Sequence, residues 1–208
     1  MRKFVQAVHQ RAVARSMKFG RRVARNEDGA TAIEFAMVGV PFFMMLFGIM
    51  GVGLYFFSIF NLENAVETAA RPFRTGESRV QYPSTTPLEI VASKTKFADA
   101  ICQNLAGFFD CANKLRVQVI NVTALQKTTP GAIPQIGKCL FKADPLTPDI
   151  LIPAAQTKFD PAAQSDTMVV TACYEMDFFQ FIPFIKLGNM PNGATMIQGS
   201  TAFKNEPY

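Results

Sequence analysis

Histidine is almost absent from this chain of 208 residues, since His9 is the only one. Imidazole is a common general base and metal ligand, so its absence after residue 9 removes a usual catalytic and zinc-binding group from most of the chain. The four cysteines include no Cys-x2-Cys pair, which argues against a zinc site. We therefore expect no enzymatic activity, no metal, no cofactor and no small-molecule substrate. An anchored enzyme that uses a free cysteine as nucleophile is the alternative.

Charged residues are missing from one long stretch. Between Glu34 and Glu63 there is no Asp, Glu, Lys, Arg or His. As a helix, residues 30–60 would be about 46 Å long, whereas the hydrocarbon core of a bilayer is about 30 Å thick. A backbone in lipid must satisfy its own hydrogen bonds, so a single crossing is helical. We predict a transmembrane helix over residues 30–60; the alternative, a buried helix of a soluble protein, would show a polar stripe.

Positive charge is concentrated before this segment. Residues 1–29 contain eight Lys or Arg and two acidic residues, whereas the remaining 179 residues contain 13 basic and 14 acidic ones. A basic flank before a first span stays in the cytoplasm, so residues 1–29 are predicted to be a cytoplasmic leader and the chain after residue 60 to lie outside. The apolar run is too long and too late for a secretory signal. We expect no nucleic-acid binding; binding of the leader to anionic lipid is an alternative.

All four cysteines follow the predicted span, in a compartment that favours disulfides. Three pairings are possible. We prefer Cys102 with Cys111 and Cys139 with Cys173, because the first pair closes a short local loop.

Residues 61–85 are predicted to form a stem and linker. Apolar residues at helical spacing continue the membrane helix to Pro72 or shortly before, and a loop follows. Thr86, Pro87 and Glu89 then have the pattern of a helix start, with a capping box. This helix, over residues 87–106, has an apolar face that would cover a sheet: Ile90, Val91, Phe97, Ala98, Ile101 and Leu105.

Strands are predicted over residues 115–124, 168–176 and 194–203, with the first two paired and a turn over residues 188–193. A Pro-rich insertion, residues 127–165, separates the first two strands and has room for a short strand near 136–141. The predicted class is α+β. It comprises an N-terminal transmembrane helix that extends into a stem, and a small extracytoplasmic domain (86–208) with a helix packed on an antiparallel sheet, stabilised by disulfides.

A second apolar stretch is too short to cross a bilayer. We interpret it first as core packing; a partner surface or a loop resting on the membrane are the alternatives. Its apolar contact candidates are Phe178, Phe179, Phe181 and Phe184.

Gly29, followed by Glu34 at the head of a long apolar helix, resembles the processing site of type IV prepilins, where a membrane aspartic peptidase cuts after the glycine. Cleavage between Gly29 and Ala30 would create an amine that is mostly protonated at neutral pH. That amine could pair with Glu34 of its own or a neighbouring subunit, which would explain a charge that lipid disfavours. The alternative is an uncleaved anchor with Glu34 at the headgroups.

Two small residues flank this charge. Ala32 and Ala36 are four apart and would let a partner helix approach closely, although a plain lipid-facing turn fits equally well. Glu34 and Phe35 are the candidate register residues for assembly.

The sequence resembles the TadE-like proteins of tight-adherence (Flp) pilus assembly. The matching pieces are residues 28–37, 64–71, the strand containing Cys173, and 203–208. The resemblance implies a minor pilin or pseudopilin in the inner membrane of a Gram-negative bacterium, at the pilus base or tip. Its implied partners are a prepilin peptidase, other pilins or pseudopilins, and platform proteins of pilus assembly.

Two features depart from the major Flp pilins. Phe35 replaces the tyrosine of their Glu-Tyr pair, and the outer domain is large, so this chain is not expected to be the bulk subunit of a filament. An uncleaved, membrane-anchored periplasmic binding or adhesion module is the alternative function.

Overall fold

The computed structural model describes residues 28–128, 139–141, 149–153, 157–160, 165–178 and 188–207. The chain divides into two compact units, residues 1–50 and 51–208. Helix α2 (Asp28–Thr75) contributes its N-terminal part to the first unit and its C-terminal part to the second. Residues 61–85, predicted as stem and linker, therefore lie inside the second unit.

The second unit is built on an antiparallel sheet with the order β1-β4-β5. Val117 pairs with Ala172, and Ala172 pairs with Gly199, so the predicted pairing of the first two strands is confirmed. A separate two-stranded sheet contains β2, which falls inside the predicted strand near 136–141. The strands are β1 (Leu115–Asn121), β2 (Leu140–Phe141), β3 (Ile150–Leu151), β4 (Thr167–Met176) and β5 (Thr195–Lys204).

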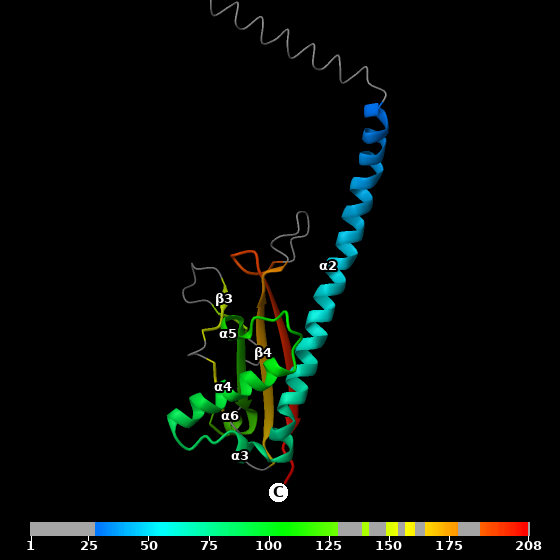
Figure 1. Cartoon of the computed structure of the whole chain (residues 1–208). Coiled ribbons are helices and arrows are strands. Elements are labelled where there is room, and N and C mark those ends of the chain that lie inside the picture. Colours follow the sequence, from blue (N-terminus) through cyan, green and yellow to red (C-terminus); the bar gives the residue numbers. More distant parts are fainter. Residues whose placement is uncertain are drawn as a thin grey trace, which may run out of the picture. The chain divides into compact units, whose positions relative to one another are not determined.

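The C-terminal part of α2 and helix α4 (Pro87–Gln103) cover one face of this sheet (Figure 1). The predicted start of α4 is confirmed: Thr86 accepts a hydrogen bond from the Glu89 N–H, and the Glu89 carboxylate accepts one from the Thr86 N–H. Hydrogen bonds from the Thr85 side chain and the Thr86 backbone lower the pKa of Glu89. The α+β class, with one helix packed on an antiparallel sheet, is confirmed.

Three local predictions are wrong. Helix α2 does not stop at Pro72 but ends at Thr75, before Gly76, whose φ of 82° suits the glycine that commonly ends a helix. Strand β1 ends at Asn121, because the Asn121 Oδ1 accepts from the Ala124 N–H and so favours a helix over continued strand. The resulting helix α6 (Val122–Thr128) and the short helix α3 (Ser78–Gln81) occupy segments predicted as strand end and loop.

Two elements differ in burial or length from what their sequence patterns suggest. Strand β1 alternates apolar and polar residues, which is typical of a strand buried on one face, yet it is buried on both faces. Helix α4 ends three residues earlier than predicted, at Gln103, and Val91 from its predicted apolar face is 62% exposed.

An aromatic cluster lies at the centre of the core. The Phe73 ring lies 5.2 Å from Tyr82, 5.0 Å from Phe97 and 6.2 Å from Phe159, measured between ring centres. Phe73 is the contribution of α2 to this cluster and is fully buried. Edge-to-face and stacked pairs of this kind add to the energy of burial alone.

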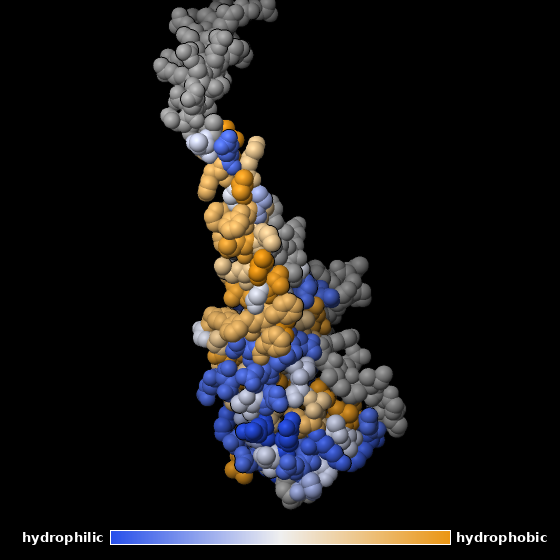
Figure 2. All heavy atoms as spheres, turned by 90° about the vertical axis from the view of Figure 1, so that its right-hand side faces the viewer, coloured by the Kyte–Doolittle hydropathy of each residue, from blue (hydrophilic) through white to orange (hydrophobic). Residues whose placement is uncertain are grey.

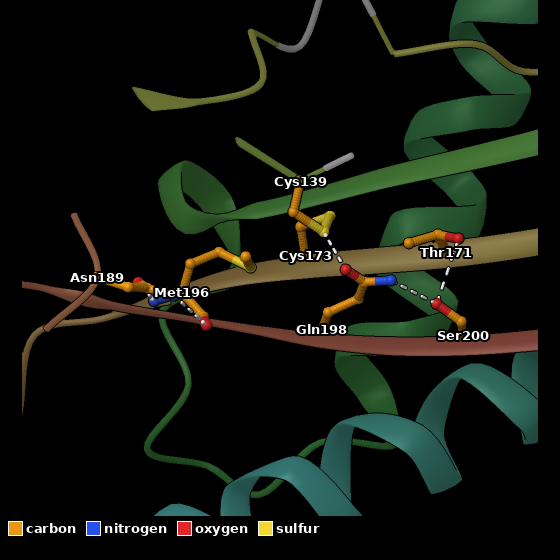
Figure 3. Close-up of a disulfide and its surroundings, with 7 residues drawn as sticks. All are labelled: Cys139, Thr171, Cys173, Asn189, Met196, Gln198 and Ser200. Atoms are coloured by element: carbon orange, nitrogen blue, oxygen red, sulfur yellow. Dashed lines mark hydrogen bonds between the residues drawn. A yellow bond between two sulfur atoms is a disulfide. The ribbon is translucent and has the colours of Figure 1, made fainter. Parts of the chain in front are cut away.

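The opposite face of the sheet carries a disulfide with polar side chains beside it (Figure 3). Cys139 is bonded to Cys173 of β4, and Gln198 of β5 lies beside the pair, with its Oε1 3.3 Å from the Cys139 sulfur. The Gln198 side-chain amide donates to the Ser200 hydroxyl, which donates to the buried Thr171 hydroxyl. The second disulfide joins Cys102 and Cys111, so both preferred pairings are confirmed.

Candidate membrane and assembly helix

The N-terminal part of α2 exposes apolar side chains on all sides. From Ile33 to Met50 large apolar residues are exposed, with Phe35 at 71% and Met37 at 74%. Within the described residues, α2 is the one helix that is long and apolar enough to cross a membrane. Figure 2 shows apolar side chains gathered along this helix, whereas hydrophilic ones gather on the surface of the second unit. A single helix of this kind suggests a single-pass membrane protein.

The predicted processing and register residues lie in the first turns of α2. Gly29 and Ala30 belong to the first turn of the helix. Glu34 is exposed, as are Ala32 and Ala36, which lie one turn apart on the same helix face. Within its unit, the described structure thus leaves the only acidic group of the apolar run open to a partner.

Phe35 packs against its own helix. A Cβ added to Gly39 would lie 3.5 Å from the Phe35 ring, so the ring covers the position left open by the glycine. Gly39 lies next to Ala36 on the helix surface. Because the Phe35 ring covers Gly39, this glycine does not extend the surface of small residues formed by Ala32 and Ala36. A partner helix would approach most closely at Ala32 and Ala36.

The character of α2 changes abruptly in the second unit. The outward side chains of Phe56 and Phe60 are 53% and 66% exposed, and the next outward residues, Glu63 and Asn64, are polar. The inward face is fully packed from here on. Its buried residues are Leu62, Ala65, Val66, Ala69, Ala70 and Phe73.

Gly199 of β5 allows this helix to approach the sheet. A Cβ at Gly199 would lie 3.1 Å from the backbone N of Glu63 and 3.1 Å from the carbonyl carbon of Leu62. These are backbone atoms that cannot rotate away, so a side chain at this position would have to push the helix and the strand slightly apart. A glycine inside a strand commonly indicates close approach of another backbone. Gly199 lies inside the strand predicted over residues 194–203, so the sequence contained this signal.

Comparison with protein-family models shows which family this helix resembles. The model of TadE-like protein matches residues 29–71. The match begins at the predicted processing glycine and includes the membrane-type helix and most of the buried stem, and it confirms the resemblance to this family over these residues. The chain matches no curated protein and no solved structure.

The segment that matches the TadE-like model therefore combines a membrane-type helix with part of the core. Most residues from Thr31 to Met50 are exposed and apolar, whereas Leu62 and Val66, both fully buried, belong to the core of the second unit. The apolar helix and the family match support association with a membrane.

The C-terminal residues close over the end of α2. The Arg74 guanidinium lies 5.4 Å from the centre of the Phe203 ring, a cation–π arrangement. The Glu206 N–H donates to the Arg74 carbonyl at 3.1 Å, and the Asn205 N–H donates to the Asp166 carbonyl at 2.9 Å. The last carbonyls of a helix lack partners within the helix, so Glu206 supplies one from the other end of the chain.

Replacing Glu206 with proline tests this contact. The Glu206→Pro variant lacks the N–H that reaches Arg74, and we expect it to lose about 0.5–1.5 kcal/mol of unfolding free energy. The Glu206→Ala variant keeps the N–H and is the matched control. Thermal unfolding followed by near-ultraviolet circular dichroism measures both; equal midpoints for the two variants would contradict the role of the backbone contact.

The other predicted site residues are the four cysteines and four phenylalanines, and the structure describes only some of them. All four cysteines are bonded in disulfides, so none is available as the thiolate that a nucleophile or zinc ligand must be. Phe178 is 47% exposed, against our first interpretation of core packing. Phe179, Phe181 and Phe184 lie outside the described residues, as does the leader before residue 28.

Proposed function

We propose that this protein is a minor pilin or pseudopilin that supports assembly of a tight-adherence type IV pilus, after a prepilin peptidase has cut between Gly29 and Ala30. One observation carries the proposal: Glu34 is an exposed acid near the start of an apolar helix, in the part of that helix that the TadE-like match covers. An ionised carboxylate in lipid is costly unless it is paired, so Glu34 calls for a cationic partner.

The new N-terminus would supply that cation. The α-amine of Ala30 is mostly protonated at neutral pH, and its pairing with Glu34 of a neighbouring subunit would fix how far one helix is shifted along the other. Ala32 and Ala36 would allow the two helices to approach closely at the same level. The role of the helix is thus structural, and we propose no enzymatic activity.

The outer domain would meet accessory subunits at the base or tip of the pilus. The basic leader supports an inner-membrane protein with its N-terminus in the cytoplasm and residues 61–208 in the periplasm, where disulfides form. The two disulfides of the described domain suit that compartment.

A Glu34→Gln variant tests the proposal in cells that make the pilus. We expect processing and protein level as in the wild type but almost no pili, because breaking an ion pair in a low-dielectric setting costs about 3–5 kcal/mol. Glu63→Gln, which changes the next acid of the same exposed helix, is the matched control and should leave pili unchanged.

Electron microscopy and the amount of sheared surface pilin give the readout. Normal piliation in the Glu34→Gln variant would contradict the register role of Glu34. Normal piliation after deletion of the whole protein would favour the alternative, an anchored binding or adhesion module.

A further inference from the structure

An exposed aromatic patch lies on the second unit where α2 is still apolar on its outward side. We define the aromatic patch as Phe56, Phe57, Phe60 and Phe108. Their side chains are 53%, 48%, 66% and 59% exposed. The first three belong to α2, whereas Phe108 comes from the loop between α4 and α5 (Cys111–Lys114) and meets Phe57 with a distance of 6.2 Å between ring centres.

The loop holds Phe108 in this place. Phe108 stacks on Phe109 at 4.6 Å, and Phe109 packs edge-on against Tyr174 of β4 at 4.8 Å. The Tyr174 hydroxyl also accepts a hydrogen bond from the Asp110 N–H at 2.9 Å, and burial raises the pKa of this tyrosine. The disulfide between Cys102 and Cys111 closes the base of the loop. Phe108 is therefore an exposed side chain on a fixed support.

The position of Phe108 along α2 can be given relative to the point where the outward residues of the helix change from apolar to polar. Outward residues are apolar up to Phe60 and become polar from Glu63. Phe57, which Phe108 contacts, is about one turn before Phe60. The loop thus reaches the helix on the apolar side of this boundary and not among the polar residues beyond it.

The length of the uncharged run places the same level at a membrane surface. There are 28 uncharged residues between Glu34 and Glu63, and about 20 residues suffice to cross the hydrocarbon core. A span that begins after Glu34 therefore ends near Tyr55, which leaves Phe56, Phe57 and Phe60 at the outer interface. Helices that lie in this interface bury apolar side chains, phenylalanine among them, at the boundary between headgroups and acyl chains.

We propose that the aromatic patch rests on the outer phospholipid interface, with the Phe108 loop as a second contact of the protein with the bilayer beside α2. A contact from the folded domain restricts how that domain can tilt on its anchor. The charges nearby suit the headgroup level: Asp110 is exposed, and Lys114 is paired with Asp177. The proposal depends on membrane insertion of α2 and not on a pilus.

Tryptophan fluorescence in vesicles tests the proposal, because the chain has no tryptophan of its own. The full-length Phe108→Trp variant is reconstituted in phosphatidylcholine vesicles with lipids brominated near the headgroup end of the acyl chains. We expect the bromine to quench most of the emission. Val80→Trp, in α3 at an 87% exposed position, is the matched control and should be unquenched.

Two further variants make each result decisive. Phe43→Trp, in the apolar run, should be quenched and so reports insertion of α2 separately from the loop. Gly107→Trp is a second loop reporter for the case that Phe108→Trp fails to fold, because a Cβ at Gly107 meets no atom within 4 Å.

Quenching of the loop reporters to the extent of Phe43→Trp supports the contact. Unquenched loop reporters, with Phe43→Trp quenched, overturn it. Emission that is blue-shifted but unquenched places a protein surface against the patch and also overturns the contact with lipid.

Discussion

A Gly29→Leu variant is expected to keep its first 29 residues, whereas the wild-type protein should begin at Ala30. Glycine has no Cβ, which allows a peptidase to approach the backbone closely, and a leucine at the cut would block that approach. Mass spectrometry of the intact, membrane-extracted protein should show a single form of each, separated by the mass of the leader. We expect the change in processing to be complete and not partial.

Gly53→Leu is the matched control for this experiment. It introduces the same side chain on the same helix, at a position where an added Cβ meets no atom within 4 Å. Its processing should equal that of the wild type. A wild-type protein that starts at Met1, or a Gly29→Leu variant with the wild-type mass, would contradict cleavage and with it the pilin proposal.

Phe73→Ala should cause a large loss of stability, about 3–5 kcal/mol, because truncation of a fully buried aromatic ring leaves a cavity. Phe73 has no exposed surface and contacts three other aromatic rings. Phe60→Ala makes the same change on the same helix at a 66% exposed position, and should stay within about 0.5 kcal/mol of the wild type.

Brief proteolysis of the detergent-solubilised protein at increasing urea concentration measures both variants. The fraction of intact second unit gives the unfolding midpoint, which should fall for Phe73→Ala alone. A shared midpoint would mean that the C-terminal part of α2 is not part of the core.

Local chemistry made several elements predictable from sequence. The start of α4 was predictable because its signal lies within four residues. Thr86 and Glu89 form the capping box that bonds free N–H groups at the helix start, and Pro87 suits the first helical position. The pairing of β1 with β4 followed from two strongly apolar strands, and the short spacing of Cys102 and Cys111 pointed to a local disulfide.

Features that depend on distant contacts were not predictable in this way. Pro72 has a low propensity for helix, yet α2 continues past it to Thr75, with Phe73 buried in the core. The hydrogen bond from Glu206 to Arg74 joins residues far apart in sequence, so no local pattern announces it. Asn121 lies inside the strand predicted over residues 115–124, whereas its side chain accepts a hydrogen bond from the Ala124 N–H at the start of α6.

The candidate functional residues also differ in whether the sequence could predict them. Glu34 was predictable, because its isolation in an apolar run depends only on its neighbours in sequence. Phe108 gave no such signal, because two adjacent phenylalanines in a loop are equally compatible with core packing. Only the ring contacts show that Phe109 supports the loop while Phe108 remains exposed.

The close approach of Gly199 to α2 sets an order of events in biosynthesis. The stem is synthesised well before its partner strand β5, and the contact with Arg74 also needs Glu206, which follows β5. Contacts between such distant segments form slowly, since a long loop must close first. Folding of the second unit can therefore finish only after β5 and the segment up to Glu206 have been synthesised, and a chain arrested before β5 would leave the apolar face of its stem uncovered.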